Sequence, residues 1–246
     1  MNTIATAAAA VTGARHLRIA RNGQDAAAMW VGEGAGAIVV CDGCGAGASS
    51  EVGARLGVQL VIAALREALV AQLRPSQLWP GVRERLVASL ARLLEAMPGD
   101  RAQLVHDHFL FTIVAAAWRH EADEVAVWAL GDGGYALGDR TCALGPFADN
   151  QPPYAGYDLL GSPQPAHLEV ADATCGGVIV ATDGATELGL DRFASPRFLA
   201  HPDALRRELA VLARSSERVD WAERRIDRQP AALQDDGAVA ILRWQP

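Results

Sequence analysis

The residues of this chain that could do chemistry are aspartates beside glycine at the ends of apolar runs. Asp42, Asp132 and Asp183 each follow such a run, in IVVCDG, VWALGDGG and VIVATDG. Asp235 and Asp236 stand directly before the last apolar run, in DDGAVAIL. A carboxylate at a strand end beside glycine is exposed at the edge of a sheet, where the backbone can approach a ligand closely. One Asp-Gly pair is an ordinary turn, whereas four of them at strand ends suggest convergence on one point.

A cluster of these aspartates would need a cation to hold it together. Carboxylates that lie close together repel one another, and each raises the pKa of its neighbours. Hard oxygen ligands select Mg²⁺ or Mn²⁺, and two such ions can clamp an in-line displacement at phosphorus and activate a water molecule. The alternative is four independent turns, and spacing alone does not decide between these two interpretations.

The elements that must position the aspartates follow from the apolar patterns along the chain. A buried strand is expected over residues 36–41, and Ser49 or Ser50 can cap a helix that runs to about residue 73. Helical spacing also predicts helices over residues 82–97, 203–214 and 218–227. Strands are expected over residues 16–20, 26–31, 109–118, 124–130, 135–137, 167–170, 178–182 and 238–244.

The order of these elements predicts an α+β fold. Strands come first, then two long helices, a run of strands, two more helices and a final strand, which is neither strict βαβ alternation nor all-β. The layer rules then favour a four-layer α-β-β-α sandwich, with two mainly antiparallel sheets flanked by helices. No internal repeat or linker divides the chain, so residues 13–246 are expected to form a single domain behind a flexible N-terminus of residues 1–12.

Composition excludes several classes of protein. The chain has 246 residues, half of them apolar, and a formal net charge of −7, which is an ordinary globular profile without the basic stripe of a nucleic-acid binder. The longest uncharged apolar run, residues 56–65, is too short to span a bilayer. The N-terminus lacks the basic segment of a secretory signal. We therefore expect a cytoplasmic protein with neither nucleic acid nor membrane as a partner.

Five segments taken together carry a family resemblance. In chain order they are GARHLRIARNGQDA, VVCDGCGAGASSEVGA, WALGDGGYAL, VIVATDGATEL and DDGAVAIL. This set resembles the type 2C metal-dependent protein phosphatases, in particular a bacterial branch that opens with a histidine followed by Gln-Asp-Ala. Each motif alone is weak, but five in order from about residue 13 to residue 244 are specific. The family fold, a β-sandwich flanked by helix pairs, agrees with the order of elements above.

The resemblance implies a role for each aspartate. Asp42 would bridge two metal ions, and the carbonyl of Gly43 would be a further ligand. Asp183 and Asp235 would complete the second metal site, and Asp25 would hold metal-bound water.

The resemblance gives two further aspartates a place in or beside the implied site. Asp132 would help to bind a third, weaker ion. Asp236, beside Asp235, is where the family often has Asn or Asp, so these two could be exchanged. The implied cofactors are two Mn²⁺ or Mg²⁺ ions and a possible third.

The grip on the substrate phosphate departs from the family pattern. Many members carry an arginine five residues before the position of Asp25, where this chain has Ala20. In a continuous strand Arg21 and Asp25 would share a face, whereas Arg18 would need a bulge to join them. We therefore favour Arg21 over Arg18 as the catalytic and substrate-binding arginine. Some members also have a proton-donating histidine where this chain has Cys44.

The function implied is hydrolysis of phosphoserine or phosphothreonine in proteins by a water that two metal ions activate. The partner would be a phosphorylated protein, in opposition to a serine/threonine kinase. One alternative is a phosphatase-like regulatory or binding module that has weak or no catalysis. Another is hydrolysis of a small phosphoester on the same scaffold.

Other chemistries fit the sequence less well. The glycines after Asp42 do not match a dinucleotide loop, and the chain has no lysine for a Walker A loop. Cys41-x-x-Cys44 could be half of a zinc site, but the other two cysteines are isolated, so free thiols are expected. His106 and His108 are expected on one face of a strand entry and not as a metal pair.

Overall fold

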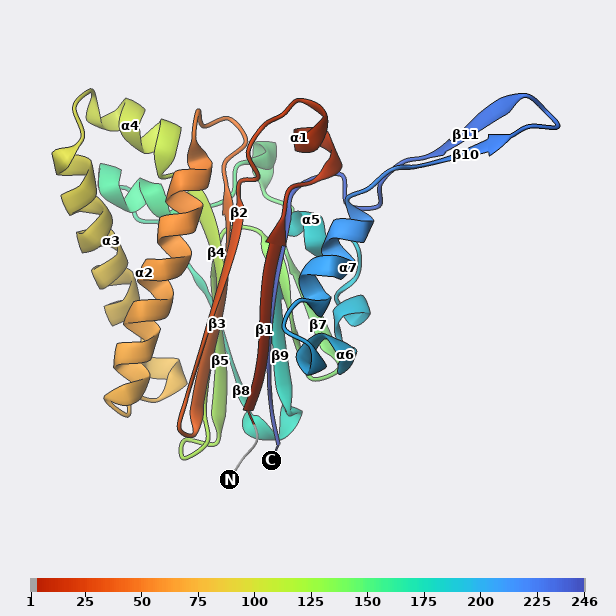
Figure 1. Ribbon diagram of the computed structural model, residues 1–246. Coiled ribbons are helices and arrows are strands. Elements are labelled where there is room, and N and C mark those ends of the chain that lie inside the picture. The colour runs from red at the N-terminus through yellow and green to blue at the C-terminus, as the bar shows by residue number, and fades with distance from the viewer. Residues whose placement is uncertain (1–3, 246) are drawn as a thin grey trace.

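Two antiparallel sheets face each other at the centre of the molecule, and helices cover both outer faces (Figure 1). The computed structural model describes residues 4–245. Sheet A consists, in spatial order, of β1 (Ile4–Val11), β12 (Gly237–Trp244), β9 (Gly177–Ala181), β6 (Gly133–Leu137) and β7 (Arg140–Leu144). Sheet B consists of β2 (Asp25–Gly32), β3 (Ala35–Gly43), β4 (Phe111–Arg119), β5 (Glu124–Leu130) and β8 (His167–Asp172).

The helices form two separate outer layers. Sheet B is covered by α2 (Ser50–Val70), α3 (Trp79–Ala96) and α4 (Arg101–His108). Sheet A is covered by α5 (Asp183–Thr186), α6 (Arg197–Ala200) and α7 (Ala204–Leu212), and the short α1 (Ala14–Arg18) connects β1 to β2. Single 3₁₀ turns lie at η1 (Pro75–Gln77), η2 (Ala148–Asn150), η3 (Ala155–Leu160), η4 (Ala173–Cys175) and η5 (Leu190–Phe193). Among the described residues no helix is long and apolar enough to cross a membrane.

Apolar side chains fill each of the three spaces between these four layers. Between the sheets, the rings of Trp118 and Trp244 stack with centroids 4.9 Å apart. Between sheet B and its helices, Trp79 of α3 stacks on Trp128 of β5 at 5.5 Å. The third core lies between sheet A and α7 and includes Phe193. The α+β, four-layer sandwich predicted from the sequence is confirmed.

The start of the chain differs from the prediction. The flexible N-terminus expected over residues 1–12 is wrong for residues 4–11, because they form β1, which pairs with β12 along its whole length from Ile4↔Trp244 to Val11↔Gly237. Its alanines alternate between buried and partly exposed positions, and Ala7 and Ala9 are buried in the core under α7. Residues 1–3 of that expected terminus lie outside the described residues. The single domain from residue 13 onward stays a prediction.

Two other segments adopt helix where strand was predicted. Residues 16–20 belong in part to α1, whose first amides, Ala14 and Arg15, donate to the carbonyls of Leu233 and Gln234 at 3.2 and 2.9 Å. The histidine pair His106 and His108 lies in α4 and not at a strand entry. The side chain of Asp100 caps α4 by accepting from the amide of Gln103 at 2.9 Å.

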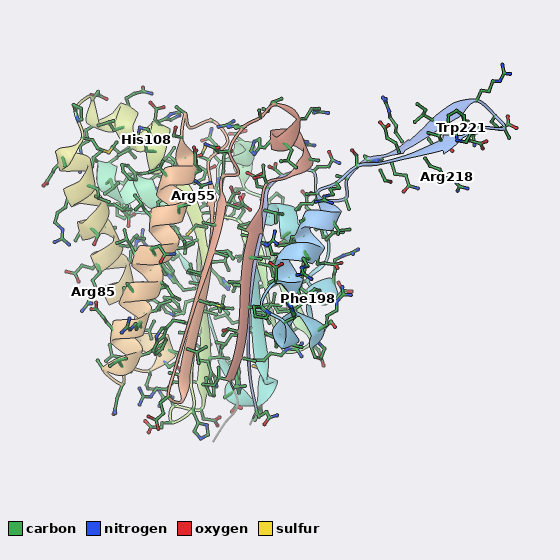
Figure 2. All side chains as sticks on the ribbon, viewed as in Figure 1. Arg55, Arg85, His108, Phe198, Arg218 and Trp221 are labelled. Carbon is green, nitrogen blue, oxygen red and sulfur yellow. The ribbon has the colours of Figure 1, made fainter. Side chains whose placement is uncertain are left out.

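Residues 218–227 form a projecting β-hairpin where a helix was predicted. Its strands β10 (Ser216–Asp220) and β11 (Arg225–Gln229) pair only with each other and extend away from both sheets (Figures 1 and 2). The register sets opposite charges across from each other, as in Arg218↔Asp227 and Asp220↔Arg225. Such pairs favour a ribbon over an amphipathic helix. Trp221 in its turn is 84% exposed.

Candidate metal centre

Five aspartates meet at one end of the two sheets because of strand direction. Asp25 begins β2 and is the register partner of Asp42, near the end of β3. Asp132 lies where the chain crosses from β5 to β6. Asp183 follows β9, and Asp235 precedes β12, the antiparallel neighbour of β9. The convergence inferred from strand ends is therefore a property of the topology.

Asp25 is the most buried member of this group. It is 8% exposed, and one of its carboxylate oxygens accepts from the hydroxyl of Thr182 at 2.5 Å. The same hydroxyl accepts from the amide of Ala238 at 2.9 Å, so Thr182 ties β2, β9 and β12 together. Burial raises the pKa of Asp25 well above its ordinary value, although the bonds from Thr182 and to Asp42 oppose the shift. Asp25 therefore forms the floor of the site.

Asp42, Asp132 and Asp183 are half-buried and share one electrostatic environment. Burial raises the pKa of Asp42, and the charges of Asp25, Asp183 and Asp132 raise it further. Burial, followed by the charge of Asp183, raises the pKa of Asp132 to about 6. Burial also raises the pKa of Asp183, and the charge of exposed Asp235 adds to the shift. The largest causes of these shifts are burial and neighbouring carboxylates, and no arginine stands among them.

The donor chemistry of this group fits a divalent cation. One oxygen of Asp132 is buried and has no hydrogen-bond partner among the described residues. An orphaned buried oxygen beside repelling carboxylates is costly unless a cation binds it. Carboxylate oxygens are the ligands that Mg²⁺ and Mn²⁺ prefer. Asp42, Asp132, Asp183 and Asp235 are therefore the candidate ligands, with the Gly43 carbonyl beside Asp42, and Asp25 is the candidate holder of metal-bound water.

Asp235 and its neighbour Asp236 have different surroundings. Asp236 is 3% exposed and accepts from the amides of Gly13 and Gln24 at 2.7 and 2.6 Å, and it bonds to Nδ1 of His16 at 2.8 Å. Its oxygens are thus used within the protein. Asp235 is exposed, and within residues 4–245 its carboxylate accepts only from the amide of Asp236, at 2.9 Å, so it remains available to a ligand. The ligand atoms of His16, Asp235 and Asp236 lie within 4.8 Å of one another, close enough to share one metal ion. The hydrogen bonds of Asp236 nevertheless favour Asp235 alone as the ligand.

The loop that carries Asp235 is held by two glycines. A Cβ atom on Gly13 would lie 2.0 Å from the carbonyl oxygen of Asp235, and one on Gly184 would lie 2.2 Å from that of Asp236. Both contacts are far too short for any side chain. The glycines of the first motif and of the Asp183-Gly184 pair therefore let three distant segments meet at this point.

Sequence reasoning missed the polar residues that support the carboxylates. Gln24 donates from its side chain to the Cys44 carbonyl at 3.2 Å and to Ser50, whose hydroxyl donates to the same carbonyl at 2.8 Å. This network fixes the loop that follows Asp42. Of the two predicted caps, Ser49 occupies the N-cap position of α2 but its side chain makes no capping hydrogen bond, and the hydroxyl of Ser50 is used in this network instead. The Gln-Asp-Ala motif was the only sequence signal for Gln24.

The structure separates the two candidate arginines. Arg21 is half-buried, and its guanidinium donates to the carbonyl of Gly47, in the loop after Asp42, at 2.8 Å. Arg18 is exposed at the end of α1. The continuous strand assumed for both is wrong, since Ala20 has a φ of 55° between α1 and β2. Arg21 nevertheless lies against the loop that carries the candidate ligands, and Arg18 does not.

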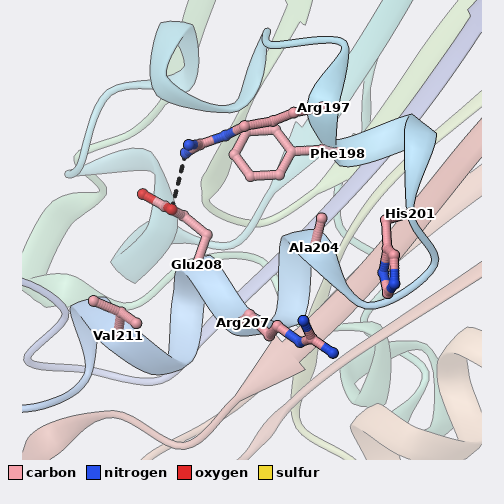
Figure 3. Close-up of a pocket in the computed structure, with 7 residues that line it drawn as sticks. All are labelled: Arg197, Phe198, His201, Ala204, Arg207, Glu208 and Val211. Atoms are coloured by element: carbon pink, nitrogen blue, oxygen red, sulfur yellow. Dashed lines mark hydrogen bonds and ion pairs between the residues drawn. The ribbon is translucent and has the colours of Figure 1, made fainter.

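Of two cavities on the described surface, the second lies beside the loop that carries Asp42. A cavity of about 350 Å³ lies over α6 and α7 and is lined by Phe198, Arg207 and Glu208, among others (Figure 3). None of the five aspartates lines it. A second cavity of about 670 Å³ includes Cys44, two residues after Asp42.

The four cysteines are free thiols, as predicted.

Metal binding should stabilise this site strongly. With Mn²⁺ at 100 times its dissociation constant, mass action adds about 2.7 kcal/mol, which in a domain of this size raises Tm by roughly 5–10 °C. Thermal melts in Mn²⁺ and in EDTA measure the difference. An unchanged Tm would contradict a metal site at these aspartates.

The metal-free protein should show the opposite of ordinary acid destabilisation. A carboxyl whose pKa is raised in the folded state stabilises the fold below its ordinary pKa of 3.8, and this contribution is lost as pH rises through the folded value, about 6 for Asp132. We therefore expect Tm in EDTA to fall between pH 5 and pH 7.5. Asp132→Asn should flatten this decline, whereas a Tm that rises over this range would be inconsistent with the cluster.

Comparison with known proteins agrees with the site. A family model for protein phosphatase 2C matches residues 12–228, so the chain belongs to the protein phosphatase 2C family. This confirms the prediction of a metal-dependent protein serine/threonine phosphatase, and the alternative of a module without catalysis is not favoured. A search of curated proteins found no match to the sequence.

Solved structures share the fold at low sequence identity. The catalytic domain of the serine/threonine phosphatase PstP, in complex with two manganese ions, is 13% identical over 100% of both chains, with a TM-score of 0.61. Stp1 from Staphylococcus aureus is 12% identical over 99% of this chain and 96% of that one, with a TM-score of 0.61. PppA from Pseudomonas aeruginosa, a regulatory component of T6SS, is 17% identical over 100% of both chains, with a TM-score of 0.58. At these identities the likeness shows the fold.

Proposed function

We propose that this chain hydrolyses phosphoserine or phosphothreonine in proteins at the five-aspartate site. The observation that carries the proposal is the convergence of Asp25, Asp42, Asp132 and Asp183, together with a buried oxygen of Asp132 that has no hydrogen-bond partner among the described residues. Bound divalent ions would lower the pKa of a water molecule, so that hydroxide is available to attack phosphorus. Their positive charge would also stabilise the phosphate oxygens. Two Mn²⁺ ions, as in the PstP complex, or two Mg²⁺ ions would fit this donor set.

Each residue of the candidate site has a defined part in this proposal. Asp42, the carbonyl of Gly43, Asp183 and Asp235 would hold the ions. Asp25, anchored by Thr182, would hold metal-bound water. Asp132, whose buried oxygen has no hydrogen-bond partner among the described residues, would help to hold a further ion.

Turnover of a phosphopeptide with and without Mn²⁺ tests the function. Purified protein should release phosphate from a phosphothreonine peptide in millimolar Mn²⁺, and EDTA should abolish the release. p-Nitrophenyl phosphate serves as a small substrate in parallel. Turnover of p-nitrophenyl phosphate alone would favour the small-phosphoester alternative, and hydrolysis of neither substrate would contradict the proposal.

Arg21 should hold the substrate phosphate. A guanidinium matches phosphate oxygens in a bidentate arrangement, and Arg21 already lies against the loop after Asp42. Arg21→Ala should weaken phosphate binding by roughly 1.5–3 kcal/mol, the range for a hydrogen bond to a charged group. KM and inhibition by inorganic phosphate measure this loss.

Arg18→Ala is the matched control for this prediction. It removes the same group from an exposed position three residues away, so its KM should equal that of the wild type. Metal affinity, measured by calorimetry, should be unchanged in both variants. A rise in KM confined to Arg18→Ala would reverse the assignment, and no rise in either would mean that metal ions alone hold the phosphate.

The partner follows from the function. A phosphorylated protein is the substrate class of the family, and we propose that this chain opposes a serine/threonine kinase. The cytoplasmic location expected from the sequence stays a prediction.

A further inference from the structure

A large cavity opens beside the five-aspartate site. It has a volume of about 670 Å³, and three segments border it: the loop after β3, α4, and the stretch from Asp149 to Leu160. Cys44 of the first segment is two residues from Asp42, and its amide donates to the carbonyl of Leu110, also in the lining, at 2.8 Å. The cavity and the candidate ligands thus share one loop.

Tyr154 connects the cavity with the aspartates. Its ring lines the cavity. Burial raises the pKa of its hydroxyl, and the interaction with Cys44 and the charges of Asp132 and Asp42 raise it further. Tyr154 therefore belongs to the lining of the cavity and lies within electrostatic range of Asp42 and Asp132. A side chain that occupies the cavity would lie next to a phosphoresidue bound at the metal site.

The lining has an acidic and aromatic character. Asp100 and Asp149 contribute carboxylates, and the rings of Tyr154 and Tyr157 meet edge to face with centroids 5.7 Å apart. None of the 22 arginines of the chain lines the cavity, and His106 is the one residue in the lining that can become positive. Carboxylates beside exposed aromatic faces attract a cation and repel an anion.

We infer that this cavity binds an arginine or lysine side chain of the phosphoprotein substrate, close in sequence to the phosphoresidue. The inference rests on the proposed function and adds a substrate preference to it. A guanidinium can stack on the tyrosine rings while it bonds to Asp149, and the apolar stem of the side chain can lie against Leu110 and Leu160.

A panel of phosphopeptides tests the inference. One phosphothreonine peptide with an otherwise alanine background receives a single arginine, or a single glutamate, at each neighbouring position in turn. At the best position arginine should raise kcat/KM about tenfold over alanine, the combined effect of one ion pair and one cation–π contact. Glutamate should lower it. The protein is assayed as the Mn²⁺-bound enzyme throughout.

Variants of the lining locate the preference. Asp149→Asn removes one charge at a residue with a φ of 53°, a conformation that Asn tolerates, and it should abolish most of the preference for arginine. Tyr157→Ala should do the same, and Tyr157→Phe should keep it. Turnover of p-nitrophenyl phosphate, which has no basic side chain to bind in the cavity, should not change. Asp139→Asn, an exposed carboxylate in the turn after β6 at the other end of sheet A, is the charge-matched control.

The outcomes separate the inference from the function beneath it. Equal hydrolysis of the arginine, alanine and glutamate peptides would overturn the inference and leave the phosphatase intact. So would a preference for arginine that survives both Asp149→Asn and Tyr157→Ala. Failure to hydrolyse any peptide or p-nitrophenyl phosphate would overturn the proposed function, and the inference with it.

Discussion

Asp42→Asn should abolish phosphatase activity and at the same time stabilise the metal-free fold. Asparagine has the same shape, so the pairing of position 42 with Asp25 and Thr112 in sheet B is retained. The variant lacks the charge that holds divalent ions. Since replacement of groups that merely orient metal ligands costs 10–100-fold, loss of a direct ligand should cost at least about 100-fold in kcat.

The gain in stability distinguishes this variant from a misfolded one. The carboxylate of Asp42 lies among like charges that raise its pKa, so its removal relieves repulsion at neutral pH. In EDTA at pH 7.5, Asp42→Asn should therefore melt above the wild type, and Mn²⁺ should no longer raise its Tm. More than a tenth of wild-type activity in this variant would falsify the assignment of Asp42 as a metal ligand.

Asp236→Ala and Asp235→Ala should have opposite consequences, although the residues are adjacent. Asp236 is buried and accepts from the amides of Gly13 and Gln24 and from His16. Its loss leaves two buried amides without partners, at 1–3 kcal/mol each, so the free energy of unfolding should drop by roughly 3 kcal/mol or more. Asp235→Ala removes an exposed carboxylate and should leave urea unfolding in EDTA near that of the wild type.

Metal affinity should show the reverse order. Asp235→Ala should weaken Mn²⁺ binding in calorimetry, because the charge of Asp235 acts on Asp183 and its carboxylate has no partner among the described residues other than the amide of Asp236. Asp236→Asn, which keeps the size of the side chain, should bind Mn²⁺ nearly as the wild type does. If Asp236→Asn lost the metal while Asp235→Ala kept it, the two roles would have to be exchanged.

The sequence predicted the elements whose own residues decide their structure. Apolar β-branched runs predicted β3 and β12, and long helical spacing predicted α2 and α3. The segments predicted wrongly depend on partners far away in the chain. The alanines of β1 have little strand propensity, and only pairing with β12 makes them a strand. In the hairpin β10–β11, opposite charges pair across the two strands. The spacing of the same residues along the chain also fits a helix, so the sequence alone did not distinguish the two.

The candidate site follows the same division. Strand ends beside glycine pointed to Asp42, Asp132 and Asp183 without any knowledge of tertiary structure. The contacts that distinguish Asp235 from Asp236, and that anchor Asp25 to Thr182, join residues far apart in the sequence. No pattern along the chain could show them. The cavity beside Tyr154 was also missed, because a Pro-, Gly- and Asn-rich stretch reads only as a loop.

The pairing of β1 with β12 determines when the site can form during protein synthesis. Sheet B draws all its strands from residues 25–172, so it can fold while the ribosome is still adding the rest of the chain. Sheet A cannot close until its last strand emerges, because β12 lies between β1 and β9. Contacts between such distant segments form late and slowly. A nascent chain therefore exposes the inner face of sheet B until β12 has emerged from the ribosome, and only then can Asp235 join the other aspartates.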